Sequence, residues 1–452
     1  MINRVVFIAV LILTFQFVYA QEKTLIKQID KELGKAISSK VILYKHLHEN
    51  PELSFREKET SKLISTKLKS FGFEIIDNIG GYGFAGVLKN GEGPVIMYRT
   101  DLDALPILEK TDVSYASCKT DTLNGLETAV MHACGHDMHM TVFVGVAELM
   151  SKMKNNWKGT LVMLGQPAEE LGGSALLLEN DLFLKIPVPS LALAYHVSPE
   201  LEAGKIGYIP GPAWAKVNTV EITVHGHGGH GAYPHQSIDP IVLSARIILA
   251  LQTIVSREIS PLNPAVVTVG AIHGGKKHNV IPDDVHMMLT LRSYSDEVAA
   301  KMISSIERIC NGIAASAGLE KKEFPNVVEI YNSLPPGINN PELTEKIAQV
   351  LKKEFGETAI LKQEPSMGAE DFYAYGSTSE KIPLCMLRLG SVSKETIEEH
   401  DKSGTPLPGL HSSYYAPIPE KTINTGVKAM IITLIQLMNE IPLHTSTQQG
   451  HE

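Results

Sequence analysis

Residues 160–170 read Thr-Leu-Val-Met-Leu-Gly-Gln-Pro-Ala-Glu-Glu, an apolar run that ends in a turn and two adjacent carboxylates. The apolar part, 160–165, predicts a buried strand, and the stretch 138–152 before it predicts a helix. A second apolar run at 191–196 predicts the next strand. Because strands alternate with helices, the sequence predicts an α/β catalytic domain built on a mostly parallel sheet. Open α/β sheets place their binding sites at the carboxyl ends of the strands, where these polar residues fall.

The chain of 452 residues is too long for one ordinary core, and its pattern changes around residues 210–212. Residues 216–330 read strand, helix, strand, strand, helix, strand, which is the order of the ferredoxin-like α+β sandwich. We therefore expect a discontinuous catalytic domain at residues 21–213 and 333–445. An inserted lid or dimerisation domain is expected at residues 214–332.

The first 20 residues carry the features of a secretory signal peptide. Arg4 precedes an apolar centre, and Val18-Tyr19-Ala20 places small side chains at the two positions that a signal peptidase reads. The apolar centre is short for a membrane span, and an uncleaved anchor is the alternative. We expect export to the periplasm or the extracellular medium, no other membrane segment, and a polar tail at residues 446–452.

Charge and motif context exclude two classes of partner. The formal net charge is −9, and removal of residues 1–20 takes away only Arg4, so the mature chain carries −9 − 1 = −10. No basic stripe is present, so nucleic acid is not an expected partner. Residues 81–86 match the dinucleotide fingerprint, but another strand follows where that motif requires a helix, so a nucleotide cofactor is not expected. The four cysteines lack framework spacing, and the fold is not expected to depend on disulfides.

Residues 131–137, Met-His-Ala-Cys-Gly-His-Asp, form a candidate metal-ligand cluster. Zinc, manganese and cobalt select cysteine sulfur and histidine nitrogen, which makes Cys134 and His136 candidate ligands. Taken alone, a buried structural cysteine is the simpler interpretation. Asp101 and Asp103 close an earlier strand and are expected beside the ligands, since a carboxylate can hold an imidazole in its ligating tautomer. Capping of the next turn is the alternative.

Glu169 and Glu170 end the strand at 160–165 and can divide two tasks. One glutamate can bind a metal ion while the other accepts a proton from the water that the ion activates, as amide hydrolysis requires. The start of a solvated helix is the alternative interpretation. His196 ends the next strand and His411 lies near the end of the chain, and each is an ordinary histidine by itself.

A second group of histidines spans residues 225–235 in the inserted domain. No carboxylate or thiol accompanies it, so we favour one imidazole, best His230, that donates a hydrogen bond to developing oxyanion charge over a second metal site. Asn279 and Arg292 lie in the same domain and together could hold a substrate carboxylate, because arginine pairs with such groups through two hydrogen bonds. A polar turn and a surface ion pair are the alternatives for these two residues.

Taken together, these motifs resemble the metal-dependent peptidase and aminoacylase superfamily, specifically its amidohydrolase branch with hippurate hydrolases and plant auxin-amino-acid conjugate hydrolases. The resemblance covers nearly the whole mature chain. The matching segments are 47–53, 101–106, 132–137, 166–170, His196, 229–230, 279–282, 367–372 and 410–412.

The resemblance implies a set of metal ligands and a general base, Glu169. One or two divalent ions are implied, with manganese or zinc most expected and cobalt, nickel or iron as alternatives. It also implies that the inserted domain forms a homodimer and that His230 serves the site of the partner subunit. The implied ligands are Cys134, His136, Glu170, His196 and His411.

The implied activity is hydrolysis of the amide bond of an N-acyl amino acid, a small molecule, to a carboxylic acid and a free amino acid. One alternative is a dipeptidase or carboxypeptidase of the same superfamily, and another is a metal-binding protein that does not catalyse. The chain departs from the family pattern at positions that are not candidate ligands, which leaves the acyl group open. These positions are Thr100, Met138, Met140, Gly165 and Ser413.

Overall fold

The computed structural model describes residues 2–440, with side chains described from residue 23 onward except at 331–333. The polar tail expected at 446–452 lies outside the described residues. Within them the chain forms two compact units. The large unit comprises residues up to 210, residues 339–363 and residues from 378 onward, and the inserted unit comprises residues 211–338 and 364–377.

The large unit is built on an eight-stranded sheet with the order β1-β2-β6-β3-β7-β18-β8-β17. Its centre, from β6 through β3 and β7 to β18, is parallel throughout, whereas β1 and β2 add an antiparallel edge. This arrangement confirms the predicted α/β class with a mostly parallel sheet. The strands are β1 (Glu74–Ile79), β2 (Gly83–Asn90), β3 (Val95–Asp101), β6 (Gly159–Gln166), β7 (Leu191–Glu202), β8 (Ile206–Tyr208), β17 (Ile360–Lys362) and β18 (Leu384–Val392).

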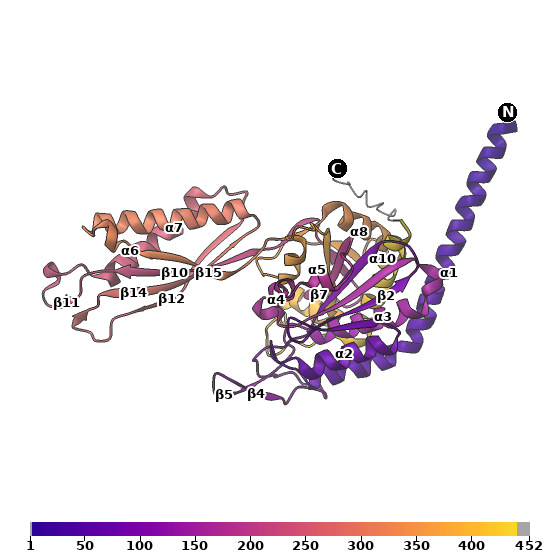
Figure 1. Cartoon of the computed structure of the whole chain (residues 1–452), viewed down its shortest axis with the longest axis horizontal. Helices are drawn as coiled ribbons and strands as arrows, with labels where there is room; N and C mark the ends of the chain where they lie inside the picture. Colours follow the sequence, from indigo (N-terminus) through magenta and orange to yellow (C-terminus); the bar gives the residue numbers. More distant parts are fainter. Residues whose placement is uncertain (1, 441–452) are drawn as a thin grey trace, which may run out of the picture. The chain divides into compact units, whose positions relative to one another are not determined.

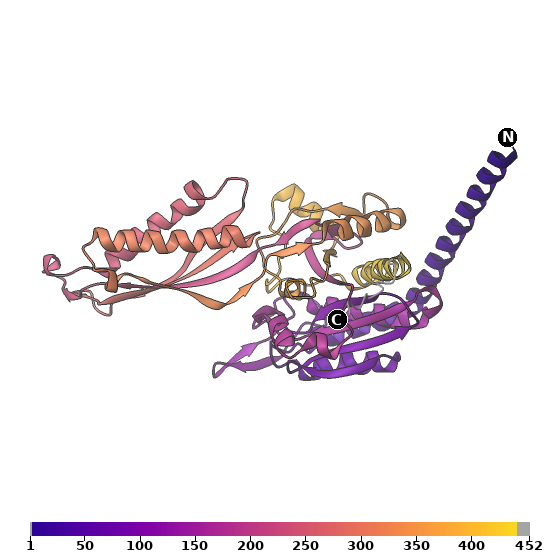
Figure 2. The ribbon, with the colours of Figure 1, turned by 45° about the horizontal axis from the view of Figure 1, so that its top comes forward.

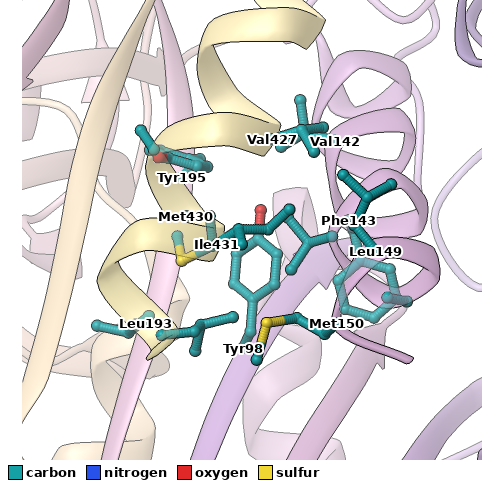
Figure 3. Packing of buried hydrophobic residues seen from close by; sticks show 14 of the residues in the cluster. Tyr98, Val142, Phe143, Leu149, Met150, Leu193, Tyr195, Val427, Met430 and Ile431 are labelled. Atoms are coloured by element: carbon teal, nitrogen blue, oxygen red, sulfur yellow. The ribbon is translucent and has the colours of Figure 1, made fainter. Parts of the chain in front are cut away.

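Three helices, α1 (Ile2–Glu49), α3 (His136–Lys152) and α10 (Pro419–Glu440), pack against one another over one face of this sheet (Figure 1). Phe143 of α3 and Met430 of α10 lie close to Tyr98 of β3 in the resulting core (Figure 3). Almost every side chain of α3 is buried, as expected for a helix that is apolar on all sides. This packing fixes the start of α3, where the Cys-Gly-His motif lies, against the carboxyl edge of the sheet.

The remaining elements of the large unit are short or lie at its surface. Residues 120–129 form a small hairpin that the sequence did not predict, because its strands are polar and mostly exposed. The remaining elements of the large unit are α2 (Lys58–Ser70), β4 (Thr120–Leu123), β5 (Leu126–Ala129), α4 (Gly173–Glu179), α5 (Leu182–Lys185), α8 (Pro341–Phe355) and α9 (Lys394–Ser403).

The inserted unit contains an antiparallel sheet with the order β12-β14-β10-β15, and α6 and α7 lie together on one face of it (Figure 1, Figure 2). Its elements follow the predicted β-α-β-β-α-β order. Asp239 caps α6 by accepting the backbone N–H of Ile241 at 2.8 Å, and Ser295 caps α7 in the same way. The elements are β10 (Lys216–His225), α6 (Pro240–Thr253), β12 (Ala265–Gly274), β14 (Asp284–Ser293), α7 (Asp296–Ser316) and β15 (Asn326–Leu334).

The inserted unit is wider than the predicted 214–332, because it includes a second segment, residues 364–377. Within that unit, the backbone N–H of Ser366 donates to the carbonyl of Ala213 at 3.0 Å, and that of Ala215 donates to Gly368 at 2.9 Å. These hydrogen bonds join chain positions far apart in sequence, so no local pattern indicates them.

One helical stretch in the described residues, Pro240–Glu258, could cross a membrane if only its length and apolar composition are considered. From the sequence, no such segment is expected beyond the amino terminus. Part of this stretch, including Ile247 and Leu251, packs in the core of the inserted unit, as the core helix of a globular domain does.

Candidate metal centre

The backbone turns sharply between Cys134 and His136. Gly135 lies between them in the left-handed region with φ 78°, and a Cβ atom there would come within 2.6 Å of Val197 Cγ2. Only glycine fits this position without strain. His136 is the first residue of α3, so the glycine lets a thiol and an imidazole project from adjacent positions at the edge of the sheet.

Side chains from four distant segments converge beside this turn. The Sγ atom of Cys134 lies 3.5 Å from Nε2 of His196 on β7. Oε1 of Glu170 lies 3.9 Å from Nε2 of His136 and 3.1 Å from Nε2 of His411. The structure therefore brings all five predicted ligands into one cluster.

The donor atoms of this cluster fall into three overlapping groups, within each of which they lie no more than 4.8 Å apart. Glu169, the predicted base, shares one group, with its Oε2 atom 3.9 Å from Nε2 of His136. Glu170 is partly buried, whereas the His411 side chain is half-exposed and marks the open side of the site. The buried members of the cluster are Cys134, His136, His196 and Glu169. The groups are Cys134, His136 and His196; Cys134, Glu170 and His411; and His136, Glu169 and Glu170.

Hydrogen bonds hold the two buried imidazoles in the tautomer that a metal site needs. Nδ1–H of His136 donates to the carbonyl of Asp103 at 2.8 Å, and Nδ1–H of His196 donates to the carbonyl of Val197 at 2.8 Å. Both Nε2 lone pairs then face the cluster. Among the described residues, Nε2 of His136 is buried and has no hydrogen-bond partner. A buried nitrogen of this kind, in a set of thiol, imidazole and carboxylate donors, fits a divalent metal ion.

Asp101 is fully buried behind the cluster. It accepts hydrogen bonds from Arg99 at 2.8 Å and from Nδ1–H of His139 at 2.8 Å. Burial alone would raise the pKa of Asp101, but His136, His139 and Arg99 outweigh it and hold this pKa well below its usual range. Asp101 therefore places a negative charge beside the donor atoms without being exposed itself.

Asp103 holds the turn that carries the two glutamates. Its carboxylate accepts the backbone N–H groups of Glu169 and Glu170, each at 3.1 Å, and the hydroxyl of Ser54 at 2.7 Å. Burial raises the pKa of Asp103, but its interactions with His136 outweigh this effect, so the pKa is lowered. Both aspartates thus contact the candidate ligands, as expected from the sequence.

His139 and Glu57 are two functional candidates that sequence reasoning missed. Nε2 of His139 accepts the backbone N–H of Val197 at 2.9 Å, directly after His196. The spacing of His136 and His139, three positions apart on one helix, was a signal that could have indicated a shared environment. Glu57 left no local signal, because its contact with the turn is a hydrogen bond from the backbone N–H of Ala168, which is distant in sequence.

The predicted oxyanion donor, His230, and the predicted substrate-binding residues, Asn279 and Arg292, lie in the inserted unit, at two places. His230 and Asn279 are exposed and adjoin the short pairing of β11 (Gly229–His230) with β13 (Val280–Ile281). Arg292 is half-buried near the far end of β14. It lies eight positions beyond Asp284, where β14 begins, which is about 26 Å along the strand at 3.3 Å per residue. Asn279 lies before Asp284, in the loop between β12 and β14. Strand geometry therefore argues against Asn279 and Arg292 holding one carboxylate together within one chain.

Comparisons with known proteins agree with this geometry. The sequence model of peptidase family M20/M25/M40 matches residues 97–405. A protein named hippurate hydrolase from Campylobacter jejuni is 38% identical over 329 residues, covering 72% of this chain and 82% of the relative. Thermostable carboxypeptidase 2 from Saccharolobus solfataricus is 33% identical over 399 residues, covering 87% of this chain and 94% of the relative.

A solved structure from Bacillus subtilis, titled a dinuclear metal-binding peptidase of family M20, matches with a TM-score of 0.73 and 29% identity, covering 90% of this chain and 100% of that chain. The fold, the donor cluster and these matches define a metal-dependent hydrolase with an inserted second domain. The chain belongs to peptidase family M20/M25/M40, in its amidohydrolase branch. This confirms the family that the sequence motifs indicated.

Proposed function

We propose that this protein hydrolyses the amide bond of N-acyl amino acids, releasing a carboxylic acid and a free amino acid. One observation carries the proposal: Glu169, a carboxylate outside the set of five proposed ligands, lies within 3.9 Å of that set. A metal-storage site needs no such extra base, which argues against the non-catalytic alternative. The relative named hippurate hydrolase supports the substrate class, since hippurate is the benzoyl amide of glycine.

Five residues would hold one or two divalent ions, with manganese or zinc as the proposed metals. Such an ion, when bound, lowers the pKa of water and polarises the acyl carbonyl. Cysteine with histidine and carboxylate suits several transition metals, so the donor set alone does not choose among them. The proposed ligands are Cys134, His136, Glu170, His196 and His411.

Glu169 is the proposed general base and acid. It takes the proton of the attacking water as the new carbon–oxygen bond forms, and it returns that proton to the amide nitrogen as the carbon–nitrogen bond breaks. His230 is proposed to donate a hydrogen bond to the oxyanion. Asn279 or Arg292 is proposed to bind the carboxylate of the amino acid.

Cleavage of peptides is the second candidate, which the relative named thermostable carboxypeptidase 2 favours. The deciding experiment compares a panel of N-acyl amino acids with a panel of dipeptides, using protein stripped of metal and refilled with one ion at a time. We expect higher kcat/KM for the N-acyl amino acids with manganese or zinc. Higher values for dipeptides would replace the proposal with the second candidate, and no hydrolysis of either panel with any ion would refute both.

We also propose a homodimer formed through the inserted unit. Val242 and Leu249 lie seven positions apart on α6, so they share one face of the helix, and they are 55% and 74% exposed. Within the described residues, β12 is an edge strand that pairs only with β14. Exposed apolar side chains and an open strand edge are features that a partner covers. Light scattering coupled to size exclusion tests this proposal, and a monomer at micromolar concentration would refute it.

We propose export with removal of residues 1–20, on the sequence features of that segment. Amino-terminal sequencing of the protein recovered from its host tests this proposal. A mature protein that begins at Gln21 is expected, and an intact Met1 would favour the uncleaved anchor.

A further inference from the structure

Three successive backbone amides, those of Ala168, Glu169 and Glu170, each donate to a buried carboxylate. Asp103 accepts the second and third, each at 3.1 Å, and Glu57 accepts the first through Oε1 at 2.7 Å. Glu57 precedes α2, far from this turn in the sequence. The turn that carries the proposed base is therefore held from two sides.

The same Oε1 atom of Glu57 also accepts the backbone N–H of Phe55 at 3.0 Å. Phe55 and Ala168 both have left-handed backbones, with φ of 64° and 54°. This conformation is sterically unfavourable for a non-glycine residue, so it persists only where the surroundings stabilise it. The N–H groups of these two strained residues both donate to one buried oxygen of Glu57. This indicates that Glu57 supplies the stabilisation.

Glu57 keeps this position at an energetic cost. Its side chain is completely buried, and burial together with the charge of Asp103 raises its pKa to about 7. Loss of the side chain would leave the amides of Phe55 and Ala168 without their buried acceptor, which destabilises the turn. An apolar residue would avoid the buried carboxylate but could not accept either amide.

We propose that Glu57 is a positioning residue that sets the place of Glu169 and Glu170 through the amide of Ala168. It does not touch the reacting atoms, and this inference rests on the proposed hydrolytic role of Glu169. Its effect depends on the position of an acceptor oxygen, not on negative charge. The variant E57Q keeps an acceptor oxygen without the charge, whereas E57D keeps the charge but is shorter by about 1.5 Å.

The test measures kcat and KM for an N-acyl amino acid, together with the Kd for Zn²⁺ by competition with a chelator. We expect E57D to lower kcat by about 10–100-fold and to weaken Zn²⁺ binding by about 10-fold, with KM within about 3-fold of the wild type. We expect E57Q to stay within about 3-fold on all three measurements. Activity retained by E57D and lost by E57Q would show that charge matters and would overturn the proposal.

Glu52 offers a matched control. It accepts the backbone N–H groups of Glu59 at 3.2 Å and Thr60 at 2.8 Å near the start of α2, but it bonds none of the three amides of the turn. The variant E52A should lower the melting temperature without changing kcat or Kd. Equal losses in E52A and E57D would show a general effect of α2 and would refute the specific role.

The Zn²⁺ measurement keeps the two proposals separate. If the wild type hydrolyses no acyl-amino acid, the proposed function fails, yet weaker Zn²⁺ binding by E57D than by E57Q would still support the positioning role, since Glu170 follows the same turn. Equal Zn²⁺ binding by wild type, E57D and E57Q would refute that role whatever the substrate.

Discussion

The Nε2 atom of His411 lies 3.1 Å from Oε1 of Glu170, although the two residues belong to distant parts of the chain. These two proposed ligands come together only when the large unit is folded. We therefore expect the free energy of metal binding at the proposed site to be coupled to the free energy of folding.

Removal of metal should lower the thermal stability of the protein. At a free ion concentration about 100 times Kd, binding adds about 2.7 kcal/mol to the free energy of unfolding, and a chelator abolishes this gain. Differential scanning fluorimetry with and without the chelator measures the effect. The variant H411A should show a smaller difference than the wild type, and an equal difference would contradict a ligand role for His411.

The variant E169Q should lower kcat by about 10²–10⁴-fold, the usual contribution of a general base. Gln keeps the shape of the side chain but cannot accept the proton. Metal content, measured by mass spectrometry, should stay at the wild-type value, and E179Q, at an exposed position of α4, serves as the control. Full hydrolysis by metal-loaded E169Q would show that another group accepts the proton.

The stability contributed by His48 should depend on pH. Burial opposes the charge of His48, but hydrogen bonds to Asp137 at 2.6 Å and Glu109 at 3.0 Å outweigh it and raise its pKa from 6.5 to about 10. Because the folded pKa is above the unfolded one, this stabilisation is complete below about pH 6.5 and is lost as pH rises to about 10.

Urea unfolding of metal-free wild type and H48N at several pH values tests this expectation. The gap between their free energies of unfolding should be widest near pH 6 and should narrow towards pH 10, by at most about 1.4 kcal/mol per pH unit. H46N is the control, since His46 is exposed on the same helix. A gap that widens with rising pH would mean that His48 is neutral when folded.

Mixing two inactive variants should restore activity if His230 serves the site of the partner subunit. A heterodimer of E169Q and H230A would contain one site with both groups intact, so random subunit exchange should recover about a quarter of wild-type kcat. A mixture of E169Q with the double variant E169Q/H230A is the control and should stay inactive. No recovery from the first mixture, once exchange is demonstrated, would place His230 outside the partner's site.

The sequence predicted the elements in which the pattern of apolar residues is clear. Residues 160–165 lie within β6 and residues 138–152 within α3, because both stretches are apolar and bounded by turns. The convergence of Cys134 and His411 was also expected, although only from the resemblance to a family. Neither residue carries a local signal for its distant partner.

Other features depend on contacts between distant segments and could not be predicted. The role of Glu57 depends on an amide at Ala168, and the second segment of the inserted unit depends on backbone hydrogen bonds of Ser366 and Gly368. The separation of Asn279 from Arg292 follows from strand direction, which a shared domain does not reveal. In each case the deciding partner is a backbone group or a register, and residue type at a single position does not encode it.

The two stretches that build the inserted unit, 211–338 and 364–377, are separated by a piece of the large unit, so the chain passes between the units four times. A graft that moves only residues 211–338 into a relative would omit residues 364–377. It would therefore omit Ser366 and Gly368, whose backbone groups bond Ala213 and Ala215. Natural recombination meets the same obstacle, because a single crossover pair cannot move this unit whole. The two units are therefore expected to have been inherited together, with variation accumulating by point substitution and not by exchange of a cassette.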